Sequence, residues 1–208
     1  KLQMRNLSDI ASIIFFFIII ILIFIFSIGP DEKQLSIIGA SILWSVLILS
    51  TSISINKSLV DDYRDGNFFV YQFAGFSFEL VSIIKILTSW ILYQLPLLLI
   101  VPIMSLILNI SQEKIFVLMI TMAIGSPILS ILTIIATAMM LTNRRNLTLG
   151  SLVILPLSIP IIIFAMGAIN SDVEIFLPQV YILISMLLFF AAIGPWIASA
   201  CIKISLKN

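Results

Sequence analysis

Six long uncharged runs constrain this chain more than any other feature of its sequence. Each run is between 21 and 29 residues long, and they cover 10–30, 34–56, 86–112, 115–143, 146–171 and 175–202. A membrane-spanning helix needs about 20 mostly apolar residues, so each run can cross a bilayer once and none can form a helical hairpin across it. The sequence therefore predicts an all-α integral membrane protein of one domain, 1–208, with six transmembrane helices. We place the spans approximately at 10–29, 35–56, 86–109, 115–141, 147–169 and 179–201.

The first run has two interpretations. A cleaved signal peptide also begins with positive charges before an apolar stretch, and here Lys1 and Arg5 precede the run. However, the run contains no small-residue cleavage site and ends in a Gly-Pro pair. We therefore expect this segment to remain as a transmembrane helix.

The distribution of positive charges predicts the orientation. With the N-terminus inside, nine of the eleven Lys and Arg residues lie on the cytoplasmic side, and only Lys33 and Lys114 lie in outer loops. Positive charge gathers in cytoplasmic loops of membrane proteins. We therefore expect both termini to be cytoplasmic. The outer loops are short, which leaves no large external domain for ligand binding or catalysis.

Composition limits the chemistry of the chain. The sequence is 61% hydrophobic, contains no histidine and has a single cysteine, Cys201. This excludes a histidine base, a His-ligated metal, an internal disulfide and a CxxC pair within these residues. No uncharged run carries an ionised residue at its centre, which argues against a proton-coupled carrier. We expect a non-catalytic membrane protein without a metal site.

The longest connection, 57–85, lies between the second and third predicted spans on the cytoplasmic side. It begins with an acidic stretch that contains Asp61, Asp62 and Asp65 and ends in Gly66. An aromatic segment follows, in which Phe69, Phe73, Phe76 and Leu80 recur at i, i+4, i+7 and i+11. This spacing predicts one short helix with an apolar stripe, lying at the membrane surface. We expect Asn67 to cap its start and Gly75 to interrupt it.

Two functions fit this segment. One is an interfacial anchor whose acidic residues are simply solvated, and the spacing alone favours it. The other is a docking element for a cytoplasmic partner. In that case the three aspartates would face basic groups of the partner, and the aromatic stripe would fill a groove.

The segment from Asp61 to Gly66 resembles the opening of the coupling helix in permease subunits of exporter-type ABC transporters. The closer resemblance is to the cytochrome c maturation protein B family, the membrane subunit of the haem exporter complex. Other segments resemble this family in the same order along the chain, so that the resemblance covers nearly its whole length. They are 26–30, Trp44, Trp90 with 95–98, 125–127, and 155–160 with 163–165.

This resemblance implies an ABC-2 exporter-like permease in a bacterial inner membrane, or alternatively a mitochondrial one. It implies a separate cytoplasmic ATPase subunit and three further proteins of cytochrome c maturation, which are the haem-handling membrane protein C, the small membrane protein D and the haem chaperone E. ATP hydrolysis by the ATPase would be coupled to haem delivery through release of the haem-loaded chaperone. The sequence agrees in having no G-x-x-x-x-G-K-[ST] phosphate loop. The residues expected to couple to the ATPase are Asp61, Asp62, Arg64, Asp65, Gly66, Phe69 and Phe73.

The chain also departs from the family pattern. Where the family often has a glutamate after the Asp-Gly pair and a histidine before the tryptophan of the third span, this sequence has Phe69 and Ser89. Haem iron is usually held by His, Cys, Met or Tyr. The methionines within the spans fit packing roles, because flexible thioethers fill irregular helix interfaces. We therefore expect no cofactor to bind this chain directly, with ATP on the partner and haem handled by the complex.

Prolines and tryptophans are the remaining candidates. Pro96 and Pro102 lie in the third span and Pro127 in the fourth, while Pro156 and Pro160 share a face of the fifth. Proline removes a backbone donor and bends a helix. These bends are either fixed packing features or gating hinges, and packing is the simpler interpretation. Trp44 and Trp90 are candidates for structural or partner-facing roles, or for interfacial anchors.

Arg144 and Arg145 fit the positive-inside pattern, and they are also candidates for contact with the ATPase or with lipid headgroups. Two other functions remain open on the sequence. One is an exporter permease for another amphiphile, such as a lipid-linked glycan. The other is a membrane scaffold that transports nothing.

Overall fold

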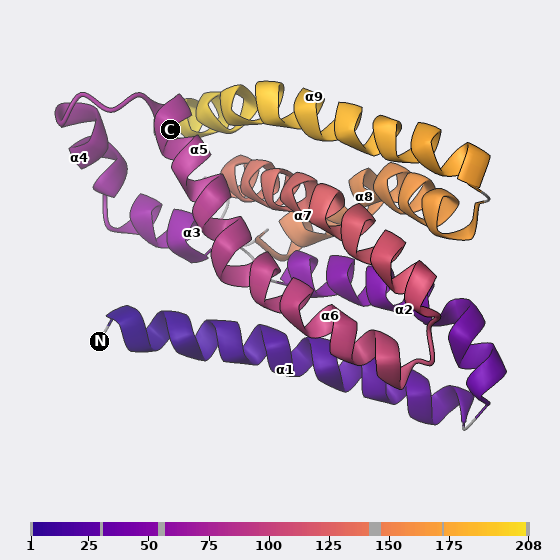
Figure 1. Ribbon diagram of the computed structural model, residues 1–208. Helices are drawn as coiled ribbons and strands as arrows, with labels where there is room; N and C mark the ends of the chain where they lie inside the picture. Colours follow the sequence, from indigo (N-terminus) through magenta and orange to yellow (C-terminus); the bar gives the residue numbers. More distant parts are fainter. Residues whose placement is uncertain (1, 30, 54–56, 142–146, 172, 207–208) are drawn as a thin grey trace.

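A computed structural model describes residues 2–29, 31–53, 57–141, 147–171 and 173–206. The described residues are helical throughout, joined by short turns, and contain no strand, so the all-α prediction is confirmed. Figure 1 shows the helices in chain order. They are α1 (Leu2–Ile28), α2 (Glu32–Ile53), α3 (Lys57–Arg64), α4 (Asn67–Phe73), α5 (Phe78–Ser89), the π-helical turn η1 (Trp90–Gln94), α6 (Leu95–Ile107), α7 (Gln112–Met140), α8 (Leu147–Asn170) and α9 (Val173–Ser205).

Five helical segments in the described part of the chain are long and apolar enough to cross a membrane. They are Asp9–Ile28, Glu32–Ser52, Phe78–Ile107, Gln112–Met140 and Phe176–Ser205. The third of these joins α5, η1 and α6 without a break. The described apolar part of α8, Ile154–Asn170, is shorter. The chain is therefore a multi-helix protein of the kind that spans a membrane several times.

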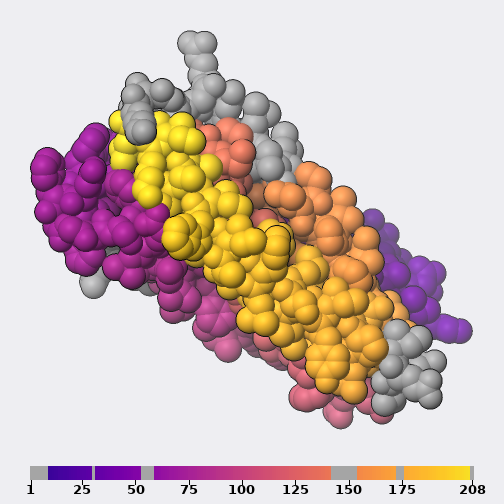
Figure 2. Space-filling view, turned by 90° about the horizontal axis from the view of Figure 1, so that it is seen from above, coloured from indigo at the N-terminus to yellow at the C-terminus, as the bar shows by residue number. Residues whose placement is uncertain are grey.

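The long helices run side by side along the length of the molecule (Figure 1). Both termini lie at the same end, and the short helices α3 and α4 lie at that end as well. The space-filling view shows α9 stretched along one surface, with the region of α3 to α5 beside its C-terminal end (Figure 2). At this end of the molecule, α3 and α4 therefore lie close to the last residues of α9.

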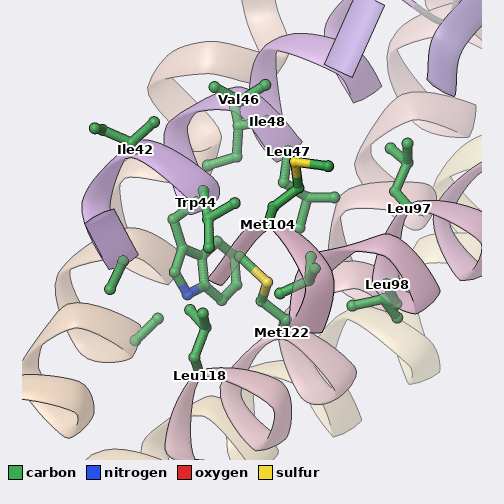
Figure 3. Packing of buried hydrophobic residues seen from close by; sticks show 14 of the residues in the cluster. Ile42, Trp44, Val46, Leu47, Ile48, Leu97, Leu98, Met104, Leu118 and Met122 are labelled. Atoms are coloured by element: carbon green, nitrogen blue, oxygen red, sulfur yellow. The ribbon is translucent and has the colours of Figure 1, made fainter. Parts of the chain in front are cut away.

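The main core forms around α2 and α7, the two most buried of the long helices. Its centre is Trp44, whose side chain is fully buried and lies near Leu118 and Met122 of α7 (Figure 3). A Cβ atom at Gly125 would lie 2.5 Å from Cη2 of the Trp44 indole, so only glycine leaves room for the ring there. Trp44 is therefore a packing residue of the core and does not anchor the chain at an interface.

Local capping explains where two of the helices begin. The Asp31 carboxylate accepts hydrogen bonds from the backbone N–H groups of Lys33 and Gln34, at 3.1 and 3.2 Å, and caps α2. The Ser77 hydroxyl accepts the N–H of Leu80 at 3.3 Å and caps α5. As a result α5 begins at Phe78, inside the segment that the sequence assigns to the cytoplasmic connection.

Candidate functional site

Residues 57–77, which we call the end segment, form two short helices joined by a turn. Gly66 connects them with a φ of 72°, in the left-handed region that favours glycine. Gly75 has a φ of 80° and ends α4. The predicted apolar stripe is therefore divided, because Phe69 and Phe73 lie in α4, whereas Leu80 lies in α5. The prediction of a single helix through Leu80 was wrong, and the predicted interruption at Gly75 is where the chain turns.

The start of α4 also differs from its prediction. Gly66 occupies the N-cap position and makes no side-chain capping bond. Asn67 is the first residue of the helix, and its amide Nδ2 donates instead to Oδ1 of Asp62 at 3.1 Å. Asn67 therefore does not cap α4, and it links α4 to α3.

Asp62 is the centre of a polar network that joins three helices. Its Oδ2 lies 2.6 Å from Nζ of Lys85 in α5, and the same oxygen accepts a hydrogen bond from the Tyr71 hydroxyl of α4 at 3.0 Å. The side chains of Asp62 and Lys85 are only 13% and 16% exposed. Burial raises the pKa of Tyr71, and the hydrogen bond to Asp62 and its negative charge raise it further. The Asp62 carboxylate is thus engaged within the chain, whereas the two sequence interpretations left it either solvated or facing a partner.

A second apolar cluster supports this network. The ring of Phe68 makes edge contacts with the rings of Tyr71 and Phe78, with centroids 6.1 Å apart in both pairs. The cluster extends into the last turns of α7 and α9. Its buried members are Leu59, Val60, Phe68, Phe78, Val81, Ile86, Ile131, Ile134, Ile135, Ala138, Leu141, Ala198 and Ile202. The end segment is therefore packed against three of the long helices.

The C-terminal end of α9 is bonded to the same region. One carboxylate oxygen of Glu79 accepts hydrogen bonds from the Ser199 hydroxyl and from Nζ of Lys203, both at 2.7 Å. The Tyr63 hydroxyl of α3 donates to the backbone oxygen of Ser205 at 3.0 Å. These contacts lie where α9 meets the region of α3 to α5 in Figure 2. Both α3 and α5 are thereby fastened to α9.

The outer side of the end segment carries the other predicted residues. Arg64 and Asp65 are exposed, and Asp61 is half-buried. Phe69 is 49% exposed and Phe73 is 91% exposed, on the side of α4 away from the buried Phe68. The end segment thus exposes charged and aromatic side chains, while other side chains of the same segment are packed inside.

Polar contacts also hold the π-helical turn η1, which lies in the middle of the third segment. Trp90 donates from Nε1 to the Ser126 hydroxyl of α7 at 3.0 Å, so its indole is tied to a neighbouring helix. Gln94 is 2% exposed and donates from Nε2 to the Thr51 hydroxyl of α2 at 2.6 Å. Such side-chain bonds between helices help to hold membrane bundles together.

The predicted prolines all lie inside helices or at their starts. Pro96 follows η1 at the start of α6, and Pro102 lies within α6. Pro127 lies within α7, directly after Ser126. Pro156 and Pro160 are both exposed on α8. Gating at these prolines stays a prediction, and Arg144 and Arg145 lie outside the described residues.

Sequence reasoning missed the partners of the acidic residues. Lys85 and Lys203 were counted as positive-inside charges, and Glu79 as one charge of the cytoplasmic connection. The available signal was that the acidic and basic members of both pairs, Asp62 with Lys85 and Glu79 with Lys203, are predicted on the same side of the membrane. Tyr71 lies among the phenylalanines of the aromatic segment, and only its hydroxyl group sets it apart from them.

Comparison with known proteins agrees with the resemblance in the sequence. Residues 1–205 match the family model described as CcmB protein. Heme exporter protein B of Haemophilus influenzae is 31% identical over 211 residues, which cover 100% of this chain and 95% of that protein. Heme exporter protein B of Bradyrhizobium diazoefficiens is 29% identical, covering 91% and 87% of the two chains. That of Escherichia coli K12 is also 29% identical, covering 100% and 95%.

Proposed function

The chain belongs to the CcmB protein family, and from this we propose that it is the permease subunit of an ABC transporter-type complex for c-type cytochrome biogenesis. In this proposal a separate cytoplasmic subunit hydrolyses ATP. The end segment couples that hydrolysis to haem delivery, through release of a haem-loaded chaperone. The name Heme exporter protein B, carried by the relatives, supports haem as the cargo of the complex.

The proposed topology has six transmembrane helices with both termini in the cytoplasm. Five are the segments described above, and α8, with 24 residues from Leu147 to Asn170, is the sixth. The position of nine of the eleven Lys and Arg residues supports this orientation in a bacterial inner membrane. The end segment then lies at the cytoplasmic face, where an ATPase can reach it.

One observation carries the coupling proposal. The end segment exposes Phe73 and Asp65, while its buried side chains are bonded to α5 and α9 and pack against the end of α7. A partner that binds the exposed side can therefore displace long helices, because the inner side is buried and paired. A solvated surface loop without these inner contacts would absorb the same displacement.

The residues of the end segment then divide into two roles. Arg64, Asp65, Phe69 and Phe73 are exposed and contact the ATPase. Aromatic anchors dominate the binding free energy of many interfaces, and exposed charges steer association. Asp62 is a positioning residue, since its carboxylate fixes α4 and α5 relative to α3.

The other proposed partners are the haem-handling membrane protein C, the small membrane protein D and the haem chaperone E of cytochrome c maturation. We assign ligation of the haem iron to these partners, because this sequence contains no histidine. In this scheme the chain transmits work and binds no cofactor itself.

The test is co-purification of the ATPase subunit with this chain from membranes. Phe73→Ala should weaken association by about 2 kcal/mol, which is roughly 30-fold in affinity, and Asp65→Lys should weaken it as well. Matched controls are Phe116→Ala and Glu113→Lys, which change exposed residues near the start of α7, at the opposite end of the molecule (Figure 1).

Normal recovery of the ATPase with both end-segment variants would refute the coupling role. The composition of the purified complex separates the alternatives. An ATPase together with haem-handling partners supports this function, an ATPase alone favours an exporter of another amphiphile, and no ATPase favours a scaffold.

A further inference from the structure

An apolar groove lies along α5, on the side where the end of α4 meets it. Its volume is about 240 Å³. It is lined by Tyr71, Phe76, Leu80, Val81, Ile84, Lys85 and Thr88. The five α5 residues span positions 80 to 88 on one side of the helix, so the groove is about 12 Å long at 1.5 Å per residue.

The polar residues Tyr71 and Lys85 also present apolar atoms to the groove, because their polar atoms are bonded to Asp62. The hydroxyl of Tyr71 donates to Asp62, and Nζ of Lys85 forms its 2.6 Å ion pair with the same carboxylate. The ring of Tyr71 and the methylene stem of Lys85 are left to line the groove. A ligand that needs hydrogen bonds would find few free groups here, whereas a hydrocarbon chain would match the surface.

The open side of the groove continues into the exposed surface of a membrane-spanning segment. Leu80, Ile84, Leu87 and Ile91 follow the helical spacing i, i+4, i+7 and i+11, and they are 42%, 51%, 53% and 51% exposed. All four lie in the candidate span Phe78–Ile107. Exposed apolar side chains in such a helix contact lipid tails. The groove is therefore a local deepening of the lipid-facing surface, bordered by Phe76 and Tyr71.

We propose that this groove binds one acyl chain of a bilayer phospholipid, wedged between α4 and α5. The acyl chain packs on Val81 and on the Tyr71 ring, below the Asp62 network. It fills the side of α4 toward the membrane, while Phe73 and Asp65 remain on the outer surface. This proposal depends on membrane insertion and not on coupling to an ATPase, so each can fail without the other.

The test uses the full chain with the photoreactive residue p-benzoyl-phenylalanine in place of Phe76. The protein is extracted, purified in detergent and then illuminated, so that a phospholipid adduct can form only with lipid retained through purification. Mass spectrometry should show that the probe at position 76 has gained the mass of a phospholipid. The same probe at Leu87, on the open lipid-facing surface, should show none, because loosely held lipid exchanges for detergent.

A second variant fills the groove. Ile84→Trp should abolish the phospholipid adduct at Phe76, whereas Ile83→Trp, at an exposed neighbour outside the groove, should leave it unchanged. Size-exclusion chromatography of both variants checks that they are folded.

Four results would overturn the proposal. Three of them are absence of a lipid adduct of the probe at position 76, an equal adduct of the probe at position 87, and a position-76 adduct that persists in Ile84→Trp. The fourth is an adduct between the position-76 probe and another protein chain in the intact complex, which would assign the groove to a partner.

Discussion

Replacing Asp62 by Asn should loosen the end segment while leaving the membrane bundle intact. The Asp62 carboxylate receives Nζ of Lys85, the hydroxyl of Tyr71 and Nδ2 of Asn67, at 2.6, 3.0 and 3.1 Å. Asn is nearly the same size as Asp but carries no charge. The substitution therefore leaves the ammonium of Lys85 without the negative charge that Asp62 supplies.

The expected cost follows from the burial of the pair. Removing one partner of a fully buried ion pair costs about 3–5 kcal/mol. Asp62 and Lys85 are 13% and 16% exposed, so water reaches them slightly and the lower value applies. A cost of about 3 kcal/mol corresponds to a change of roughly 100-fold in the local opening equilibrium. It should appear in α3 and α4, because these helices depend on the network for their position.

Amide hydrogen exchange of the chain in lipid nanodiscs measures this opening directly. Exchange at Asn67–Phe73 should accelerate about 100-fold in Asp62→Asn, with no change in the middle of α7. The control Asp65→Asn alters an exposed carboxylate of the same segment and should change exchange by less than about twofold. Adding Lys85→Met removes the ammonium as well and should restore part of the protection. If Asp62→Asn and Asp65→Asn behave alike, the network does not position the segment.

Two further outcomes test the packing and the electrostatics. Gly125→Ala places a Cβ 2.5 Å from the Trp44 ring and should lower stability by about 1–3 kcal/mol, measured by thermal unfolding in detergent, with partial rescue by Trp44→Phe. The pKa of Tyr71 is raised, so its contribution to stability is complete below about pH 10 and decreases as the pH rises toward that pKa. Difference titration of tyrosinate absorbance against Tyr71→Phe should show this pKa falling when Asp62→Asn is introduced. An unchanged pKa would contradict the contribution assigned to Asp62 beyond that of burial.

The sequence predicts helix content well because one physical rule dominates it. A long apolar run in a bilayer must satisfy its backbone bonds internally, so it forms a helix. The start of α5 was not predicted by this rule, because the third span was placed from residue 86 and the helix begins at Phe78. Cutting runs at every charge assumes that a charged residue leaves the helix for water, but Glu79 and Lys85 stay in α5 because Lys203, Ser199 and Asp62 pair with them. Such pairing joins residues far apart in the chain and leaves no local pattern.

The candidate site was predictable in location but not in its division of roles. Clustered aspartates and phenylalanines singled out the end segment, and the structure exposes Asp65 and Phe73 as expected. Nothing in their spacing distinguishes Asp62, whose carboxylate is paired with Lys85 of α5 and with Tyr71 and Asn67 of α4. Trp44 is similar, because its burial requires the glycine at position 125, on a different helix.

The two ion pairs of α5 connect this helix to its neighbours with unequal strength. Between membrane helices lipid is as apolar as the side chains, so polar bonds and close packing must supply the specificity of contact. The Asp62–Lys85 pair is buried, whereas in the Glu79–Lys203 pair the side chains are 22% and 50% exposed, so water and salt weaken the second pair more. We therefore expect a displacement of the end segment to carry α5 with it and to separate α5 from α9 first. Under this reasoning Glu79→Gln should ease the movement of α5, whereas Asp62→Asn should disconnect it.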